Sequence, residues 1–208
     1  LKGDWERLEI PYVRTLSPDL APKYLEQARR TLKRAYDRGE RDPRLLAVLG
    51  LCEVDAGNEA GAREYLEAAA AIGPIRPRAN YELARLRFAQ FRAAPAGEGG
   101  RLSAVQAAEV LKPLFAARAA PPPQPEVYEL IGEVWAGVAS TPTRGHLAVL
   151  DEGVRFFPRR TGLVLRAAEL LLAHGHREDA AIMLEVAARV ASDATERERL
   201  VQLQRQLQ

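Results

Sequence analysis

The sequence has little of several features that would indicate a particular class of protein. It contains one cysteine, Cys52, so no disulfide can form within the chain. Only 6% of its residues are aromatic, and no stretch approaches the roughly 18 consecutive apolar residues of a membrane-spanning helix. Its 30 basic and 28 acidic side chains nearly cancel, which argues against the strongly basic surface of a nucleic-acid-binding protein. We therefore expect neither bound nucleic acid nor direct membrane insertion.

Catalytic motifs are also missing. The run "GEGG" at 97–100 has neither the preceding strand pattern nor the following lysine of a phosphate-binding loop. His174 and His176 lie close to Glu178 and Asp179, but their spacing matches no zinc pattern and they fall in a predicted turn between helices. We expect no catalytic residue, no metal and no cofactor, and hence a protein that is not an enzyme. A metal or hydrolase site at the two histidines is kept as an alternative.

Helical periodicity is the feature that the sequence does have. From residue 18 onward, apolar residues recur three and four positions apart, as on the buried face of a helix. With 47% apolar residues, the chain can form a substantial core. The pattern predicts an all-α fold of ten helices, at residues 18–38, 43–56, 58–71, 77–92, 103–118, 125–138, 144–156, 160–174, 176–190 and 193–206.

Residues typical of helix ends separate these segments. Asp42 precedes Pro43, as an N-cap residue followed by proline in the first turn. Ser103 and Thr195 each have a Gln or Glu three residues later, which is the spacing of a capping box. Glycines follow several helices and are expected to adopt the left-handed cap conformation; they are Gly39, Gly57, Gly73 and Gly175.

The helices repeat in pairs with a fixed spacing of small and large residues. Gly50 is followed by small or large apolar residues at steps of twelve, four and three, and then by a proline; these are Ala62, Leu66, Ala69 and Pro74. The first three steps recur from Ala168, at Ala180, Leu184 and Ala187. A small residue in each helix lets the two backbones pack closely, and the large residue fills the remaining space. Because one such pair cannot bury its face alone, several pairs must stack.

This pattern resembles the tetratricopeptide repeat of bacterial proteins, over roughly residues 43–190. The resemblance implies a right-handed α-solenoid of antiparallel helix pairs, a TPR-like superhelix. It divides a domain at 18–208 into a half-repeat, four repeats and a capping helix, at residues 18–42, 43–76, 77–124, 125–160, 161–192 and 193–208.

The segment at 1–17 has a different pattern. Trp5, Ile10, Tyr12 and Val13 form an alternating apolar patch, which predicts that this segment is an extended N-terminal arm. Such an arm either belongs to an upstream region or lies along the first helices and covers their apolar edge; we favour the second. Because the sequence does not begin with methionine, we expect the natural protein to continue upstream.

The resemblance implies a concave groove that is lined by the first helix of each pair and binds peptides or partner proteins. Carried onto this sequence, the groove positions are Arg44, Ala47, Leu51 and Val54, then Arg78, Tyr81, Arg85 and Phe88, then Glu126, Glu129 and Glu133, and finally Leu165, Arg166, Glu169 and Leu172. Arg78 and Arg85 either bind a partner's carboxylate beside the two aromatic rings, or pair with Glu82 and neighbouring acids.

Two hypotheses about function follow from this resemblance. The first is a non-enzymatic scaffold, a monomer or weak dimer, that binds a protein or peptide partner in the groove. The alternative is an assembly or oligomerisation module of a larger, possibly enzymatic, multidomain protein, which the apolar patch at 5–13 supports.

Overall fold

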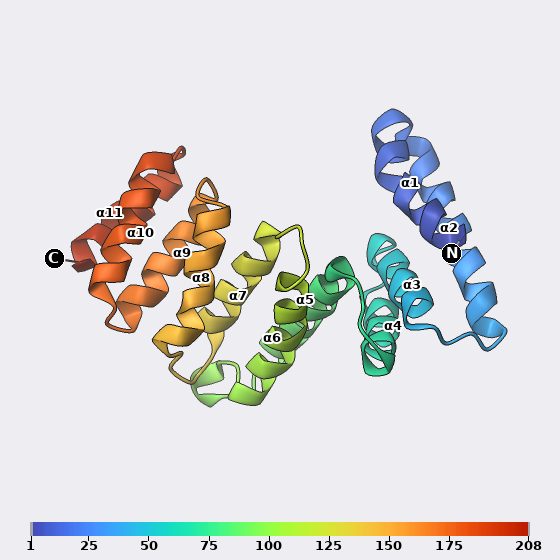
Figure 1. Ribbon diagram of the computed structural model, residues 1–208, viewed down its shortest axis with the longest axis horizontal. Coiled ribbons are helices and arrows are strands. Elements are labelled where there is room, and N and C mark those ends of the chain that lie inside the picture. The colour runs from blue at the N-terminus through green and yellow to red at the C-terminus, as the bar shows by residue number, and fades with distance from the viewer. Residues whose placement is uncertain (1, 208) are drawn as a thin grey trace. The chain divides into compact units, whose positions relative to one another are not determined.

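The computed structural model describes residues 2–207, apart from the side chains of Trp5, Glu6, Glu9, Tyr12 and Arg14. Within this range the chain forms α-helices, two 3-10 turns and one isolated bridge between Leu102 and Val138, without a strand (Figure 1). The helices are α1 (Lys2–Leu16), α2 (Ala21–Asp37), α3 (Pro43–Asp55), α4 (Glu59–Ile72), α5 (Pro77–Ala93), α6 (Ala104–Arg118), α7 (Pro125–Gly137), α8 (Arg144–Phe156), α9 (Thr161–Ala173), α10 (Arg177–Val190) and α11 (Ala194–Leu207).

The all-α prediction is confirmed, and each of the ten predicted helices is present with ends within a few residues of those expected. The first of them begins later than predicted, because residues 18–20 form a 3-10 turn, η1 (Pro18–Leu20), before α2. None of the helices within residues 2–207 is long and apolar enough to cross a membrane.

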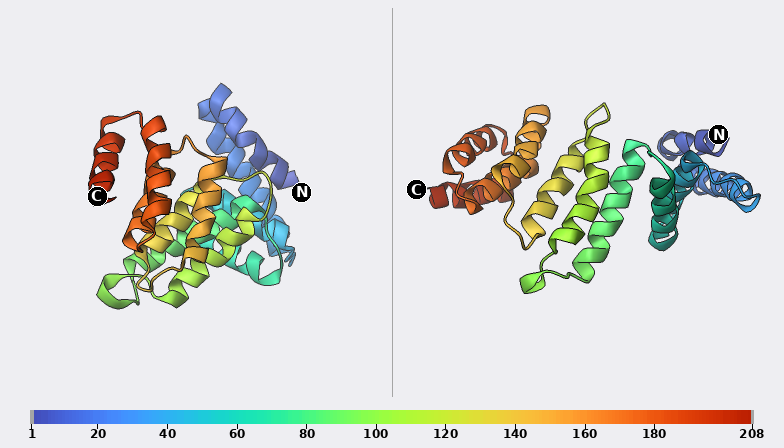
Figure 2. Two further views of the ribbon diagram at one scale, coloured as in Figure 1. Left: turned by 60° about the vertical axis from the view of Figure 1, so that its left-hand side comes forward. Right: turned by 60° about the horizontal axis from the view of Figure 1, so that its bottom comes forward.

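The chain divides into two compact units, residues 1–87 and 88–208, with the boundary inside α5. In the first unit α1 packs on α2, α2 on α3, and α3 on α4. In the second unit neighbouring helices pack in sequence from α6 to α11, and α9 also contacts α7 and α11. Figure 2 shows the antiparallel pairing of successive helices from two further directions. Each unit is therefore a stack of helix pairs.

Close backbone approach between α3 and α4 depends on Gly50. A Cβ atom at this position would lie 2.7 Å from Leu66 Cγ and 3.2 Å from the carbonyl oxygen of Ala62, which is closer than ordinary van der Waals contact. Ala62, Leu66 and Ala69 are fully buried. The spacing that the sequence repeats therefore marks residues at a helix–helix contact.

The prediction of an extended arm at 1–17 is wrong, because residues 2–16 form the helix α1. Ile10 is 3% exposed. A Cβ at Gly3 would lie 2.6 Å from Leu32 Cγ and 3.3 Å from the Ala28 carbonyl oxygen, which repeats the Gly50 contact. The predicted half-repeat at 18–42 is therefore the second helix of a complete pair, and α1 covers its apolar edge.

The fixed repeat spacing explains why this pair was missed. The separation in sequence between Gly3 and Ala28 is much longer than the one between Gly50 and Ala62, although both pairs make the same contact. The residue that precedes Ala28 by the same number of positions as Gly50 precedes Ala62 is Leu16, which is neither small nor buried. The side chains of Trp5 and Tyr12, on which the predicted apolar patch partly depended, lie outside the described residues.

Most predicted helix ends are confirmed. The Asp42 side chain accepts hydrogen bonds from the Arg44 and Leu45 amides, and Ser103 forms a capping box with Gln106. At α11 the cap is Asp193, which accepts from the Glu196 amide at 2.8 Å, so the prediction of Thr195 is wrong. Gly39, Gly57 and Gly175 have positive φ angles as expected, whereas Gly73 is extended, at φ −178°.

Candidate functional site

Three of the predicted groove positions on α3 line a small cleft in the first unit. Arg44, Ala47 and Leu51 border a space of about 210 Å³ together with Val48, residues 74–76 and Ala79. Arg44 is exposed, whereas Leu51 is only 3% exposed and forms part of the cleft floor. The cleft therefore offers two guanidinium groups beside an apolar base, those of Arg44 and of Arg76, and Arg76 pairs with Asp4 at 2.6 Å. Val54, the fourth predicted position on α3, does not border it.

The predicted cations on α5 are held by acidic side chains of the same unit. Glu82, which is 2% exposed, pairs with Arg78 at 2.5 Å and with Arg85 at 2.7 Å. Arg85 also pairs with Glu59 of α4 at 3.2 Å. Of the two alternatives for these arginines, the structure therefore contains the pairing with Glu82. Two guanidinium groups compensate the charge of one buried carboxylate, which would otherwise be costly to bury.

The predicted aromatic positions on α5 differ in accessibility. The Arg78 guanidinium lies 5.4 Å from the centre of the Tyr81 ring, a cation–π contact. Phe88, the next predicted position, is 8% exposed and belongs to the second unit. Phe88 is therefore a core residue of this chain, and only the Tyr81 ring is partly exposed.

Ion pairs connect the predicted groove positions of the second unit. Arg160 pairs with Glu126 at 3.1 Å and with Glu129 at 3.6 Å. Arg166 of α9 pairs with Glu133 of α7 at 2.8 Å and with Glu169 at 2.9 Å. Leu165 is buried, at 1% exposure. The charges of the predicted groove positions Glu126, Glu129 and Glu133 are therefore neutralised by arginines.

Glu169 extends this series of pairs to α11. It accepts two hydrogen bonds from the Arg199 guanidinium. This hydrogen bonding, opposed by burial, raises the pKa of Arg199 above its ordinary value. Charges of alternating sign thus connect three helices through Glu133, Arg166, Glu169 and Arg199.

A larger cleft lies beside these pairs, between α9, α10 and α11. Its volume is about 390 Å³, and it is lined by Glu169, Leu172, Ala173, Arg177, Arg199, Gln202, Leu203 and Gln206. Glu169 and Leu172 were predicted as groove positions. The α11 residues were not predicted, because this helix was interpreted as a cap. Its polar face is visible in the sequence, at Arg199, Gln202 and Gln206, with the three- and four-residue spacing of one helix face.

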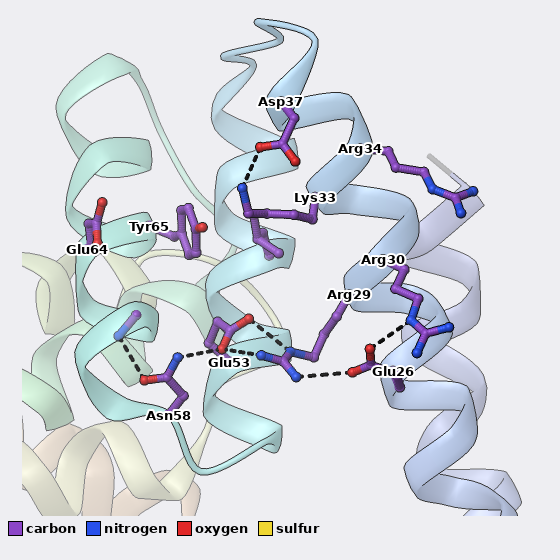
Figure 3. Close-up of a pocket in the computed structure, with 12 residues that line it drawn as sticks. Glu26, Arg29, Arg30, Lys33, Arg34, Asp37, Glu53, Asn58, Glu64 and Tyr65 are labelled. Atoms are coloured by element: carbon purple, nitrogen blue, oxygen red, sulfur yellow. Dashed lines mark hydrogen bonds and ion pairs between the residues drawn. The ribbon is translucent and has the colours of Figure 1, made fainter.

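A hollow of the first unit was missed by sequence reasoning. It has a volume of about 540 Å³ and lies between α2 and α4, over α3 (Figure 3). Its walls are lined by Glu26, Arg29, Arg30, Lys33, Arg34 and Asp37 on one side and by Asn58, Gly61, Glu64 and Tyr65 on the other, above Leu49 and Glu53. The signal for it was the dense run of basic residues on α2, which a search restricted to first helices did not consider.

A partly buried ion pair forms the floor of this hollow. The Arg29 Nε and Nη2 atoms each donate to Glu53 at 2.9 Å, and Asn58 Nδ2 donates to the same carboxylate at 2.8 Å. Glu53 is 6% exposed. Hydrogen bonding to Glu53, opposed by burial, raises the pKa of Arg29. This network joins α2, α3 and the start of α4, and it fixes the shape of the hollow.

The remaining candidates for chemistry are isolated. Burial raises the pKa of the Cys52 thiol to about 12, so it stays protonated at neutral pH. Burial and the proximity of His176 lower the pKa of His174. Among the described residues, no group of three or more histidine, cysteine, aspartate or glutamate side chains is placed to hold a metal ion.

Comparisons with known proteins identify the fold. No protein-family model matches the sequence, and no curated protein matches it significantly. Among solved structures, MamA has 16% sequence identity and a TM-score of 0.58, over 82% of this chain and 90% of MamA. TTC0263, a thermophilic TPR protein of Thermus thermophilus, has 21% identity and a TM-score of 0.55, over 95% and 98% of the two chains.

A third structure, Acl4, the assembly chaperone of RpL4, has 17% identity and a TM-score of 0.53, over 97% of this chain and 84% of Acl4. At these identities the comparisons concern the fold. The repeat spacing, the stacked helix pairs and these similarities agree, and the chain has the fold of a tetratricopeptide-repeat protein.

Proposed function

We propose that this chain is a non-enzymatic scaffold that binds a segment of a partner protein at the exposed faces of its first helices. The observation that supports this proposal is that several residues at the groove positions implied by the resemblance to the tetratricopeptide repeat border clefts. Arg44 and Leu51 border the cleft at α3, and Glu169 and Leu172 border the cleft at α9 to α11. The similarity to TPR structures supports a protein-interaction role in general.

The chemistry of the α9 to α11 cleft suits a peptide. Gln202 and Gln206 each offer an amide that can donate and accept hydrogen bonds, as a peptide backbone requires. Leu172 and Leu203 supply apolar surface for a side chain, and Arg177 supplies a cation. We expect an extended segment of mixed polarity rather than a strongly charged one, because Glu169 and Arg199 already neutralise each other.

The test compares partner capture by variants at each cleft. Gln202→Glu changes the α11 wall, and Gln204→Glu makes the same change at an exposed position of the same helix outside the cleft. Arg44→Glu changes the α3 cleft, and Arg189→Glu is its control on the exposed surface of α10. Each protein is immobilised and exposed to a lysate of the source organism, and retained proteins are quantified by mass spectrometry.

We expect a specific set of proteins to be retained by the wild type and both controls, and to be depleted by at least one cleft variant by about tenfold. Retention of the same set by all five proteins, or of none, would overturn the proposal. Circular dichroism of each variant establishes that the helices are intact.

A second candidate function is an assembly module, and it is favoured by exposed apolar side chains at the N-terminal helix. Leu8 is 57% exposed and Leu16 is 66% exposed. Light scattering on the wild type and on a Leu8→Glu, Leu16→Glu double variant tests it. A wild-type dimer that the double variant dissociates supports assembly, whereas a wild-type monomer at high concentration contradicts it.

A further inference from the structure

Helix α2 carries a row of exposed cations on one face. Lys23, Arg30 and Arg34 are separated by seven and four residues, so they lie on the same side of the helix, and Arg38 follows directly at its end. All four side chains are exposed. At about 1.5 Å per residue, the row from Lys23 to Arg34 is about 16 Å long. None of these four residues lines either of the two clefts described above.

Arg30 and Arg34 lie on a ridge between two hollows. One is the hollow between α2 and α4, which is drawn in Figure 3. The other, also of about 540 Å³, is lined among the described side chains by residues of α2, namely Pro22, Lys23, Glu26, Gln27, Arg30, Thr31 and Arg34. Both guanidinium groups therefore border space into which a partner's side chains can enter on either side.

Part of the positive charge on α2 is neutralised within the unit. Glu26 pairs with Arg29 and Arg30, Lys33 pairs with Asp37, and Arg29 also pairs with Glu53. The hydrogen bond from Arg30 lowers the pKa of Glu26, so this carboxylate is ionised at neutral pH.

The remaining cations of the row have no acidic partner among the described side chains. These are Lys23, Arg34 and Arg38. Asp19 and Glu40 flank α2 in the sequence and Glu64 lies across the hollow, and none of these three described carboxylates forms an ion pair with the three cations. In Figure 3 the Arg34 side chain extends away from the Lys33–Asp37 pair, and Glu64 lies on the opposite wall of the hollow. Within the described part of the chain, the row therefore has unneutralised positive charge.

The surface around the row favours a protein partner. No large apolar residue of α2 is among the strongly exposed ones, so the helix lacks the apolar face that membrane-surface helices insert. The chain as a whole has a net charge of only +2, far from the strongly basic character of nucleic-acid-binding domains. In addition, the partly exposed Tyr65 ring on the opposite wall of the α2–α4 hollow gives an apolar side chain a place to pack.

We infer that the basic row of α2 is a docking site for an acidic segment of a partner protein, separate from the first-helix clefts. Carboxylates two residues apart in an extended segment repeat about every 6.6 Å, so three of them span most of the row. Each carboxylate would contact an exposed guanidinium or ammonium group. The guanidinium groups of Arg30 and Arg34 can each donate two parallel hydrogen bonds to one carboxylate. Apolar side chains between the acids would enter the two hollows.

Fluorescence anisotropy with a labelled peptide of alternating glutamate and leucine tests this inference on the full chain. The key variant is Lys23→Glu, Arg34→Glu. The matched control, Arg189→Glu, Arg205→Glu, makes the same change in charge at exposed positions of α10 and α11. We expect the α2 variant to weaken binding by about tenfold or more and the control to leave it within about twofold. Raising the salt from about 50 to 300 mM should weaken wild-type binding.

Several outcomes would overturn the inference. They are equal weakening by both double variants, wild-type binding that salt does not affect, and tighter binding of a nucleic-acid duplex or of phosphatidylserine vesicles that is lost in the same α2 variant. The cleft variants Arg44→Glu and Gln202→Glu separate this site from the proposed function, because they should leave binding of the acidic peptide unchanged. Circular dichroism confirms that each variant remains helical.

Discussion

At the residue scale, the distance between paired helices is set by positions without a side chain. A Cβ atom added at Gly50 would lie 2.7 Å from Leu66 Cγ, whereas a Cβ atom added at Gly162 would have no neighbouring atom within 4 Å. Both glycines lie in helices, where alanine is favoured by up to about 1 kcal/mol. Alanine substitutions at these two sites therefore distinguish the effect of helix propensity on stability from the effect of packing.

We predict opposite effects for alanine at these two glycines. Gly162→Ala should stabilise the chain by up to about 1 kcal/mol, because only the propensity changes. Gly50→Ala should destabilise it by about 1–2 kcal/mol, because overpacking outweighs the gain in propensity. Urea unfolding followed by circular dichroism measures both. If Gly50→Ala is stabilising instead, α3 and α4 can move apart enough to accommodate the methyl group with little loss of folding free energy.

Glu152 gives a second prediction at this scale. Arg118 Nε donates to it at 2.9 Å and Tyr128 Oη at 2.7 Å, and these hydrogen bonds lower its pKa from 4.5 to about 2. Because the folded pKa is below the unfolded one, the stabilisation is complete above about pH 4.5 and is lost as the pH falls toward 2. Burial and the same hydrogen bond raise the pKa of Tyr128 to about 12, so its hydroxyl remains a donor.

Glu152→Gln should therefore cost about 1–3 kcal/mol at neutral pH and flatten the acid dependence of stability. Melting temperatures between about pH 2 and 7 measure the effect. Glu185→Gln, at an exposed position of α10, should follow the wild-type curve. If the Glu152 variant has the wild-type slope, other carboxylates account for the acid sensitivity.

Ion pairs at the candidate site differ in how far the sequence could predict them. Glu82 and Arg85 lie within one turn of the same helix, so their pairing was open to sequence reasoning. Glu133 and Arg166 belong to different helix pairs, and their contact depends on how neighbouring helices stack. The sequence therefore identified the charged positions but not the neutralisation of Glu126, Glu129 and Glu133 by arginines of other segments.

At the element scale, helix starts and ends were predicted well because caps are local. Asp42 and Ser103 satisfy amides two or three residues away, and that distance can be read from the sequence. Helix α1 was missed because its small residue, Gly3, lies outside the usual spacing from Ala28. Short apolar alternation at 5–13 then suggested extended backbone.

The packing of α1 can be tested with two aliphatic positions on the same helix. Ile10 is 3% exposed and Leu8 is 57% exposed. We predict that Ile10→Ala costs about 2–4 kcal/mol, because it leaves a cavity, and that Leu8→Ala changes stability by less than about 0.5 kcal/mol. Urea unfolding measures both. Equally small effects would mean that residues 2–16 do not pack on α2 in solution.

At the scale of the whole molecule, repetition made the fold predictable. The same steps at Gly50 and Ala168 describe contacts within a pair and carry no information about remote elements. In stacked repeats each pair contacts mainly its neighbours, so local patterns are enough to predict the architecture. Binding surfaces are not repeated in this way. The cations on the α2 wall of the first-unit hollow and the polar residues on the α11 wall of the second cleft each belong to one helix, and the repeat pattern therefore could not indicate them.

The same locality predicts that damage stays within one unit. Leu66→Ala removes a fully buried side chain of α4 and should cost about 2–5 kcal/mol there. Hydrogen–deuterium exchange with mass spectrometry should show faster exchange in α3 and α4 and unchanged exchange in α9 and α10. Leu184→Ala, the corresponding position of α10, should give the reverse pattern. Faster exchange throughout the chain in either variant would mean that the two units unfold as one cooperative structure, against the nearest-neighbour behaviour of stacked repeats.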